Sequence, residues 1–178
     1  MKVVVVYESL WGSTAAVARA IAEGFGADAR AMSTAEASAD VIIGADLIIA
    51  GAPVHSLNMP SEQTREWARV GHMGPGGAPP DLSHPMMRTW LEDLPKGTGR
   101  AAAFDTRVKP WYGWGAASKI LAGLRQAGYA PLARPRGFHV TGHPVLPRTN
   151  GVLANGEVER ARRWGAELAQ TMAHPAAR

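Results

Sequence analysis

The chain of 178 residues contains no cysteine, and this absence removes several kinds of chemistry. There are no disulfide bonds, no thiolate metal site and no cysteine nucleophile. Long hydrophobic runs are also missing, because no window approaches the roughly 18 unbroken apolar residues of a membrane span. The four valines at Val3–Val6 are too few for the apolar region of a secretory signal. We therefore expect a cytoplasmic protein with no membrane partner.

Charged residues are few, and neither sign is concentrated in one part of the chain. They make up 19% of the sequence, with 19 Lys and Arg against 15 Asp and Glu, which gives a net charge of +4. A basic balance is compatible with nucleic-acid binding. However, the basic residues are scattered, and no run of them is interleaved with aromatic side chains. We therefore expect no nucleic-acid partner.

The length and apolar content of the chain indicate one domain with its own core. A chain of 178 residues with 46% hydrophobic residues is ordinary for a single globular domain. We therefore treat residues 1–178 as one domain, in which about 173–178 form a frayed tail.

Short apolar runs alternate with helical patterns, and this alternation is typical of a doubly wound α/β fold in which helices cover both faces of a parallel sheet. The expected strands are 2–7, 27–32, 46–50, 100–104 and a fifth within 129–140 that is interrupted near Pro135. The expected helices are 15–25, a weak one in 34–44, 88–94, 116–127 and 156–172, the last capped by Asn155. Residues 70–85 are dense in Gly and Pro, and we expect a long mobile loop there.

The junction between the first strand and the first helix is unusually rich in hydroxyl groups. Ser9–Thr14 reads SLWGST and lies where unpaired helix N–H groups and the helix dipole favour an anion. Gly12 would let the backbone approach a ligand closely. Helix capping by Ser13 or Thr14 is the simpler alternative, but it explains only one hydroxyl. The stretch lacks the Gly-Lys-Ser/Thr of nucleoside-triphosphatase loops and the G-x-G-x-x-G of dinucleotide folds. We interpret it as a phosphate cradle.

This stretch resembles the FMN-phosphate signature of the flavodoxin family. The matching residues are Val5, Val6, Tyr7, Ser9, Gly12, Thr14, Ala18 and Ile21. The resemblance implies a flavodoxin-like three-layer fold with five parallel strands in the order 2-1-3-4-5, and FMN as the cofactor. By the same resemblance, Ser9, Gly12, Ser13 and Thr14 hold the phosphate, and Trp11 contributes its backbone N–H.

The resemblance also assigns the flavin ring to two later loops, at residues 51–60 and 105–115. The candidate residues are Pro53, Val54, His55 and Ser56 in the first loop, and Asp105, Thr106, Arg107, Trp111 and Tyr112 in the second. The first loop departs from the family in having no Trp or Tyr, so apolar side chains are expected on one ring face. For His55 the alternative is a solvent-facing position, and for the aromatic residues it is core or lid packing.

Arg107 has two interpretations. It either faces the pyrimidine edge of the flavin, where its charge would raise the potential of the second electron, or pairs with Asp105. His139 and His143 do not indicate a metal site, because residues four apart on an extended segment are separated by about 13 Å.

The sequence is compatible with three functions. The first is an FMN-binding redox protein that transfers electrons, whose net positive charge would suit an acidic redox partner. The second is an NAD(P)H-dependent flavin or quinone reductase, although the chain lacks the Gly-Gly-rich insertion that such reductases carry after the fourth strand. The third is a flavodoxin-like regulatory module without a stable flavin.

Overall fold

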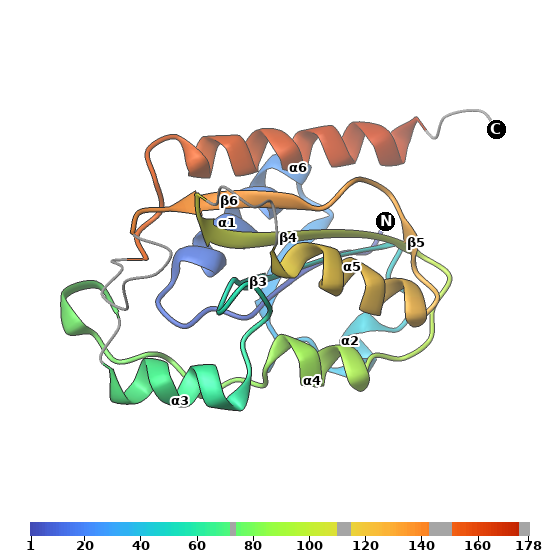
Figure 1. The fold of residues 1–178 in the computed structure, drawn as a ribbon. Helices are drawn as coiled ribbons and strands as arrows, with labels where there is room; N and C mark the ends of the chain where they lie inside the picture. The colour runs from blue at the N-terminus through green and yellow to red at the C-terminus, as the bar shows by residue number, and fades with distance from the viewer. Residues whose placement is uncertain (72–73, 110–114, 143–150, 175–178) are drawn as a thin grey trace.

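The computed structural model describes residues 1–71, 74–109, 115–142 and 151–174 (Figure 1). The strands are β1 Val3–Tyr7, β2 Ala29–Ser33, β3 Leu47–Pro53, β4 Arg100–Val108, β5 Ala130–Pro131 and β6 Arg136–Val140. The helices are α1 Ser13–Phe25, α2 Ala39–Ile42, α3 Glu62–Val70, α4 Met87–Glu92, α5 Ala116–Gln126 and α6 Glu157–Ala173, with a 3₁₀ turn η1 at Pro75–Gly77.

The strands form one parallel sheet in the order β2-β1-β3-β4-β5, and β6 also pairs with β4. The predicted order 2-1-3-4-5 is therefore confirmed. β5 and β6 both pair in parallel with β4, β5 at its start and β6 at its end, and the gap between them contains Pro135. Proline has no N–H to donate to a neighbouring strand, so the predicted interruption has a direct cause.

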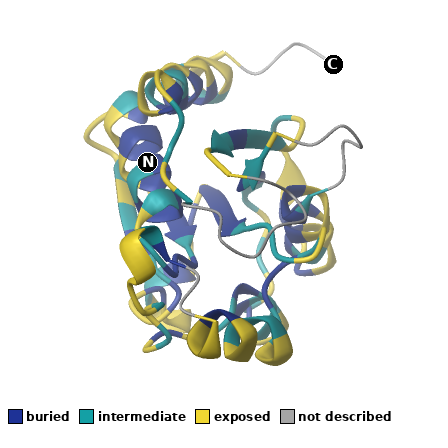
Figure 2. Cartoon of the chain, turned by 60° about the vertical axis from the view of Figure 1, so that its left-hand side comes forward, coloured by how far each residue is buried: buried dark blue, intermediate teal, exposed yellow. Residues whose placement is uncertain are grey.

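Helices cover both faces of the sheet, as Figure 1 shows. Val3 and Val5 of β1 are buried in the core beneath α1 and α6, whereas Val4 and Val6 are buried against the opposite helices, which include α4 and α5. Burial on both faces explains why β1 reads as an unbroken apolar run rather than an alternating one. Figure 2 shows the buried strands between the more exposed helices.

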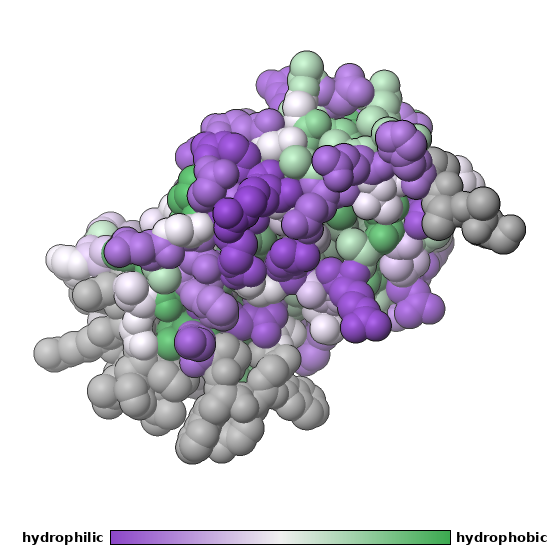
Figure 3. Space-filling view, turned by 90° about the horizontal axis from the view of Figure 1, so that it is seen from above, coloured by the Kyte–Doolittle hydropathy of each residue, from purple (hydrophilic) through white to green (hydrophobic). Residues whose placement is uncertain are grey.

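α1 and α6 pack closely because glycines lie where they meet. A Cβ atom on Gly24 would meet the backbone of Arg162, and one on Gly165 would meet the backbone of Ile21. Trp164 of α6 is buried against Phe104 and Phe138 of the sheet. The view from above is dominated by hydrophilic residues (Figure 3). None of the described helices is long and apolar enough to cross a membrane.

β4 is four residues longer than predicted. The sequence analysis ended this strand at Phe104, but it continues to Val108. β6 provides the partner for the extension, with Asp105 opposite Gly137 and Val108 opposite Val140. The polar residues at 105–107 therefore lie in a strand and not in a loop.

The sequence analysis also missed α3. Its N-terminus carries a capping box, in which the Ser61 side chain accepts a hydrogen bond from the Thr64 N–H and the Thr64 side chain accepts one from the Ser61 N–H. The sequence S-x-x-T is a variant of the usual capping box, and this signal for the start of a helix can be read directly from the sequence. The predicted cap of α6 was wrong by one residue, because Gly156, with φ of 81°, occupies the N-cap position in place of Asn155.

Candidate functional site

The carboxyl ends of β1, β3 and β4 meet at one edge of the sheet, as parallel pairing requires (Figure 1). In open α/β sheets, ligands bind at this edge where the strand order reverses, which here lies between β1 and β3. The predicted site residues lie in the last residues of β3 and β4 and in the segments that follow β1, β3 and β4. The edge is therefore the candidate site.

The start of α1 has the geometry of an anion-binding turn. Gly12 occupies the N-cap position with φ of 91°, a left-handed conformation that favours glycine. Ser9 Oγ accepts a hydrogen bond from the Gly12 N–H at 3.1 Å. No side chain caps α1, so the simpler alternative, capping by Ser13 or Thr14, is wrong. The first N–H groups of the helix donate to no described residue and can therefore bind an anion, as at other helix N-termini.

The hydroxyl groups at this turn bring three parts of the chain together. Thr14 Oγ1 lies 2.8 Å from Thr106 Oγ1 of β4, and both residues are buried. Ser13 Oγ donates a hydrogen bond to the carbonyl of Gly151, which precedes α6. Thr14 and Thr106, predicted from separate loops, are therefore neighbours.

The segment after β3 lies beside β4 and forms a tight turn. Val54 donates its N–H to the Thr106 carbonyl at 2.8 Å. His55 and Asn58 are joined by two backbone hydrogen bonds, and the two residues between them, Ser56 and Leu57, have φ of 49° and 63°. Two consecutive positive φ values are typical of a type I′ hairpin turn. Pro53, the last residue of β3, is opposite Thr106.

His55 is partly buried rather than facing solvent freely. Its ring stacks on Trp11, with 6.1 Å between centroids and 28° between planes. Burial, with a smaller effect from the charge of Arg65, lowers the pKa of His55 from 6.5 to about 4. The imidazole is therefore neutral at neutral pH and places no positive charge at this edge.

Arg107 pairs with Asp105, which is the second of its two interpretations. Its Nε and a terminal nitrogen lie 2.5 and 2.6 Å from the two carboxylate oxygens of Asp105. Asp105 is fully buried and also accepts the N–H of Ala117 at the start of α5 at 2.8 Å. Burial raises the pKa of Asp105, while Arg107 and the Ala117 N–H act in the opposite direction. The charge of Arg107 is thus balanced by a neighbouring carboxylate.

Glycines make room for the Asp105–Arg107 pair. A Cβ atom on Gly115 would meet the side chains of both Asp105 and Arg107, and one on Gly137 would meet Arg107. Trp111 and Tyr112, predicted to lie at the flavin, are outside the described residues, as is His143.

The long connection from α3 to α4 packs against the candidate phosphate loop. Trp11 Nε1 donates to the Ala78 carbonyl at 3.2 Å, and Asp81 donates its N–H to the Leu10 carbonyl at 2.8 Å. The Nε2 atom of His84 lies 3.0 Å from the Ser9 carbonyl. A cavity of about 420 Å³ lies between this connection and the start of α1. These contacts place the connection beside the phosphate loop.

Sequence reasoning missed three polar residues beneath this loop, Glu8, Arg65 and His84. Glu8 follows Val4 and Val6 at a spacing of two, so a signal existed: continued alternation points a carboxyl group into the core. Burial raises the pKa of Glu8, and the N–H of Met87 and the positive charges of Arg65 and Arg88 oppose this shift. Arg65 and His84 gave no comparable signal, because their positions depend on distant contacts.

The residues of this edge fit the phosphate end of FMN. The N–H groups of Ser13 and Thr14 donate to no described residue, and a Cβ atom on Gly12 would meet nothing within 4 Å. A phosphate needs such free donors and close backbone approach. Among the described residues, no group of His, Asp and Glu is placed to hold a metal ion.

Comparison with known proteins identifies the fold of this chain but not its activity. No family model matches the sequence, and no curated protein matches it significantly. Among solved structures, a flavodoxin from the domain Archaea shares 20% identity at a TM-score of 0.63, with 98% of this chain and 100% of that chain covered. Oxidised Flavodoxin 1 from Bacillus cereus shares 18% identity at a TM-score of 0.61, with coverages of 96% and 98%.

A third structure, described as a flavodoxin, WrbA-like protein from Agrobacterium tumefaciens, shares 23% identity at a TM-score of 0.55. The match covers 97% of this chain and 98% of that chain. Sequence identities this low show a shared fold but not a shared activity. Together with the strand order 2-1-3-4-5, these similarities show that the chain has a flavodoxin-like fold.

Proposed function

We propose that this protein binds FMN at the carboxyl edge of its sheet and acts as a redox protein in electron transfer. One observation carries the proposal: α1 begins with a left-handed Gly12 and with N–H groups that donate to no described residue, at the edge where the strand order reverses. The similarity to solved flavodoxins supports it at the level of the fold.

The roles of this chain's residues follow from where they lie. The N–H groups of Ser13 and Thr14 and nearby hydroxyls bind the phosphate, and the dipole of α1 favours its negative charge. His55 and Trp11, which stack on each other, occupy the side of the site next to β3 and offer a neutral surface. When bound, FMN supplies one- and two-electron chemistry.

The balanced charge of Arg107 changes one sequence-based hypothesis. An Arg107 free to face the flavin would favour a negative charge on the reduced ring. Because Asp105 holds the guanidinium with two hydrogen bonds, we expect only a small effect of Arg107 on the potential. The net charge of +4 still favours an acidic protein partner.

An NAD(P)H-dependent flavin or quinone reductase is the second candidate. The segment after β3 contains no Trp or Tyr at residues 51–60, and this would leave room for a nicotinamide or quinone beside the flavin.

Absorbance spectra of the purified protein test these functions. After incubation with FMN and removal of free flavin, we expect a retained flavin spectrum. A protein that stays colourless contradicts FMN binding and favours a regulatory module. Anaerobic NADPH is then added to the yellow protein. Slow or absent bleaching supports an electron carrier, and rapid bleaching supports the reductase.

A further inference from the structure

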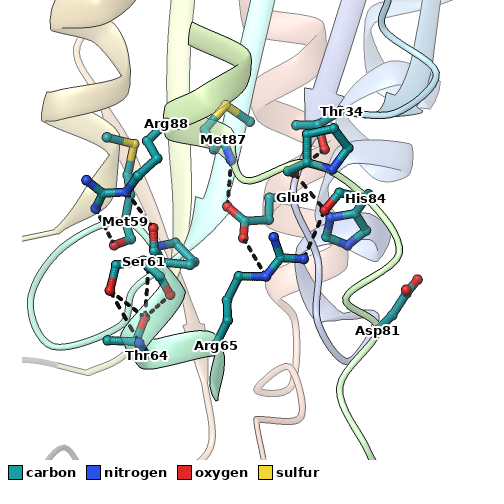
Figure 4. Close-up of polar contacts among 12 residues, drawn as sticks. Glu8, Thr34, Met59, Ser61, Thr64, Arg65, Asp81, His84, Met87 and Arg88 are labelled. Carbon is teal, nitrogen blue, oxygen red and sulfur yellow. Dashed lines mark hydrogen bonds and ion pairs between the residues drawn. The ribbon is translucent and has the colours of Figure 1, made fainter. Parts of the chain in front are cut away.

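A buried group of polar side chains, Glu8, Arg65 and His84, lies beside the candidate phosphate loop (Figure 4). Glu8 is fully buried, and Arg65 of α3 keeps only 11% of its side chain exposed. Glu8 Oε2 accepts the N–H of Met87 at 2.8 Å, and Glu8 Oε1 lies 3.9 Å from Arg65 Nε. Glu8 Oε1 has no hydrogen-bond partner among the described residues, and Arg65 brings a positive charge close to it.

Arg65 also holds the connection between α3 and α4. A terminal nitrogen of Arg65 donates to the His84 carbonyl at 2.9 Å. His84 is itself buried, and its Nε2 lies 3.0 Å from the Ser9 carbonyl. A carbonyl only accepts hydrogen bonds, so Nε2 carries the hydrogen in this contact. Arg65 is therefore connected through His84 to Ser9, the first residue of the phosphate loop.

The contacts from this connection fix the direction of two successive peptide groups. The Ser9 carbonyl accepts from His84, and the Leu10 carbonyl accepts from the Asp81 N–H. In a trans peptide the C=O and the following N–H point in opposite directions. The N–H groups of Leu10 and Trp11 therefore point away from the connection, and they donate to no described residue.

We propose that Arg65 and His84 are positioning residues for phosphate binding, because together they hold the Ser9 carbonyl back and leave the N–H groups of Leu10 and Trp11 free to donate to the ligand. This inference rests on the proposed FMN function. Glu8 supports the arrangement by holding Arg65 between β1 and the connection.

The first test compares FMN and riboflavin, which differ only in the phosphate. Arg65→Gln should weaken FMN binding by about tenfold or more, the effect of losing one charge-assisted hydrogen bond. Riboflavin binding should change by less than about twofold. The matched control is Arg69→Gln, because Arg69 lies on the same helix but is exposed, and its ion pair among the described residues is with Glu66. Equal FMN affinity in wild type and Arg65→Gln, or an equal loss for riboflavin, would overturn the inference.

A double-mutant cycle separates positioning from general loss of stability. His84→Phe removes the donor to Ser9 and keeps a ring in the buried space. If Arg65 acts through His84, the double variant should lose less FMN affinity than the product of the two single losses. Independent losses that multiply would contradict the proposed chain of contacts. Arg65→Lys, which keeps the charge with fewer donors, should give an intermediate loss and serves if Arg65→Gln does not fold.

Hydrogen exchange in the FMN-free protein tests the positioning without the cofactor. The Asp81 N–H, which donates to Leu10, should exchange faster in Arg65→Gln and at the wild-type rate in Arg69→Gln. Unchanged exchange at Asp81 in Arg65→Gln would overturn the inference. If wild type binds no FMN, the proposed function fails, whereas the exchange result still decides the role of Arg65.

Discussion

Thr14 is buried at the start of α1, where we propose that phosphate binds. Its hydroxyl lies 2.8 Å from the hydroxyl of Thr106, and both side chains are buried. Thr14→Val would leave the Thr106 hydroxyl without this partner, so we expect a loss of about 1–3 kcal/mol in the free energy of unfolding. FMN affinity should fall much more than riboflavin affinity, as measured by fluorescence titration. Thr14→Ser, which keeps the hydroxyl, is the control, and an equal loss for both ligands would show that Thr14 does not contact phosphate.

His55 should make the stability of the protein depend on pH. Its pKa is lowered from 6.5 to about 4, so between these values the unfolded chain binds a proton that the folded chain does not. The free energy of unfolding should therefore fall as the pH falls from 7 to 4.5. We expect a fall of about 1–2 kcal/mol, less than the full shift in pKa implies, because solvent reaches part of the ring. Urea unfolding at a series of pH values measures this.

His55→Asn isolates this contribution from that of Glu8, which has the opposite sign. Burial raises the pKa of Glu8 above 4.5, so the folded chain keeps this proton at higher pH and Glu8 adds stability as the pH falls. The difference between wild type and His55→Asn should shrink as the pH falls from 7 to 4.5. A difference that stays constant over this range would show that His55 titrates normally.

At the scale of elements, the contact between α1 and α6 depends on glycine. A Cβ atom on Gly165 would meet the backbone carbonyl of Ile21, and backbone cannot move aside as a flexible side chain can. Gly165→Ala should therefore lower the free energy of unfolding by about 1–3 kcal/mol, despite the better helix propensity of alanine. Chemical denaturation of the purified variant measures the change.

Gly123→Ala is the matched control for this prediction. Gly123 lies in α5, and the nearest atoms that its Cβ atom would meet belong to the side chain of Leu91, at 3.1 Å or more. We expect this variant to be neutral or slightly more stable than wild type. If Gly165→Ala were as stable as Gly123→Ala, the close helix contact would not constrain residue 165.

The elements also show where local patterns were sufficient. β1 and β3 were predicted because strands buried on both faces are apolar throughout. β4 was cut short because Asp105–Arg107 are polar, although β6 lies beside them. Once the strand continues, Asp105 and Arg107 are two residues apart on one face, and this spacing places them side by side. The length of β4 thus decided between the two interpretations of Arg107.

At the scale of the whole molecule, FMN should stabilise the fold. A ligand that binds only the folded state at 100 times its dissociation constant adds about 2.7 kcal/mol to the free energy of unfolding. For a chain of this size, we expect the melting temperature to rise by about 5–10 °C. Riboflavin at the same concentration should raise it less, because the start of α1 contributes only to phosphate binding. Equal shifts with FMN and riboflavin, or none with FMN, would contradict the proposed site.

The sequence by itself determined the class of fold, the strand order through its family resemblance, and the position of the turn at Ser9–Thr14, which we propose binds phosphate. These features are readable because they depend on neighbouring residues: an apolar run, a glycine and the first turn of a helix. Only the tertiary structure decided that the connection after α3 lies against this turn, and that Arg65 contacts both Glu8 and His84. Those contacts join residues 19 to 75 positions apart. Their formation depends on burial and long-range hydrogen bonds, which no local pattern records.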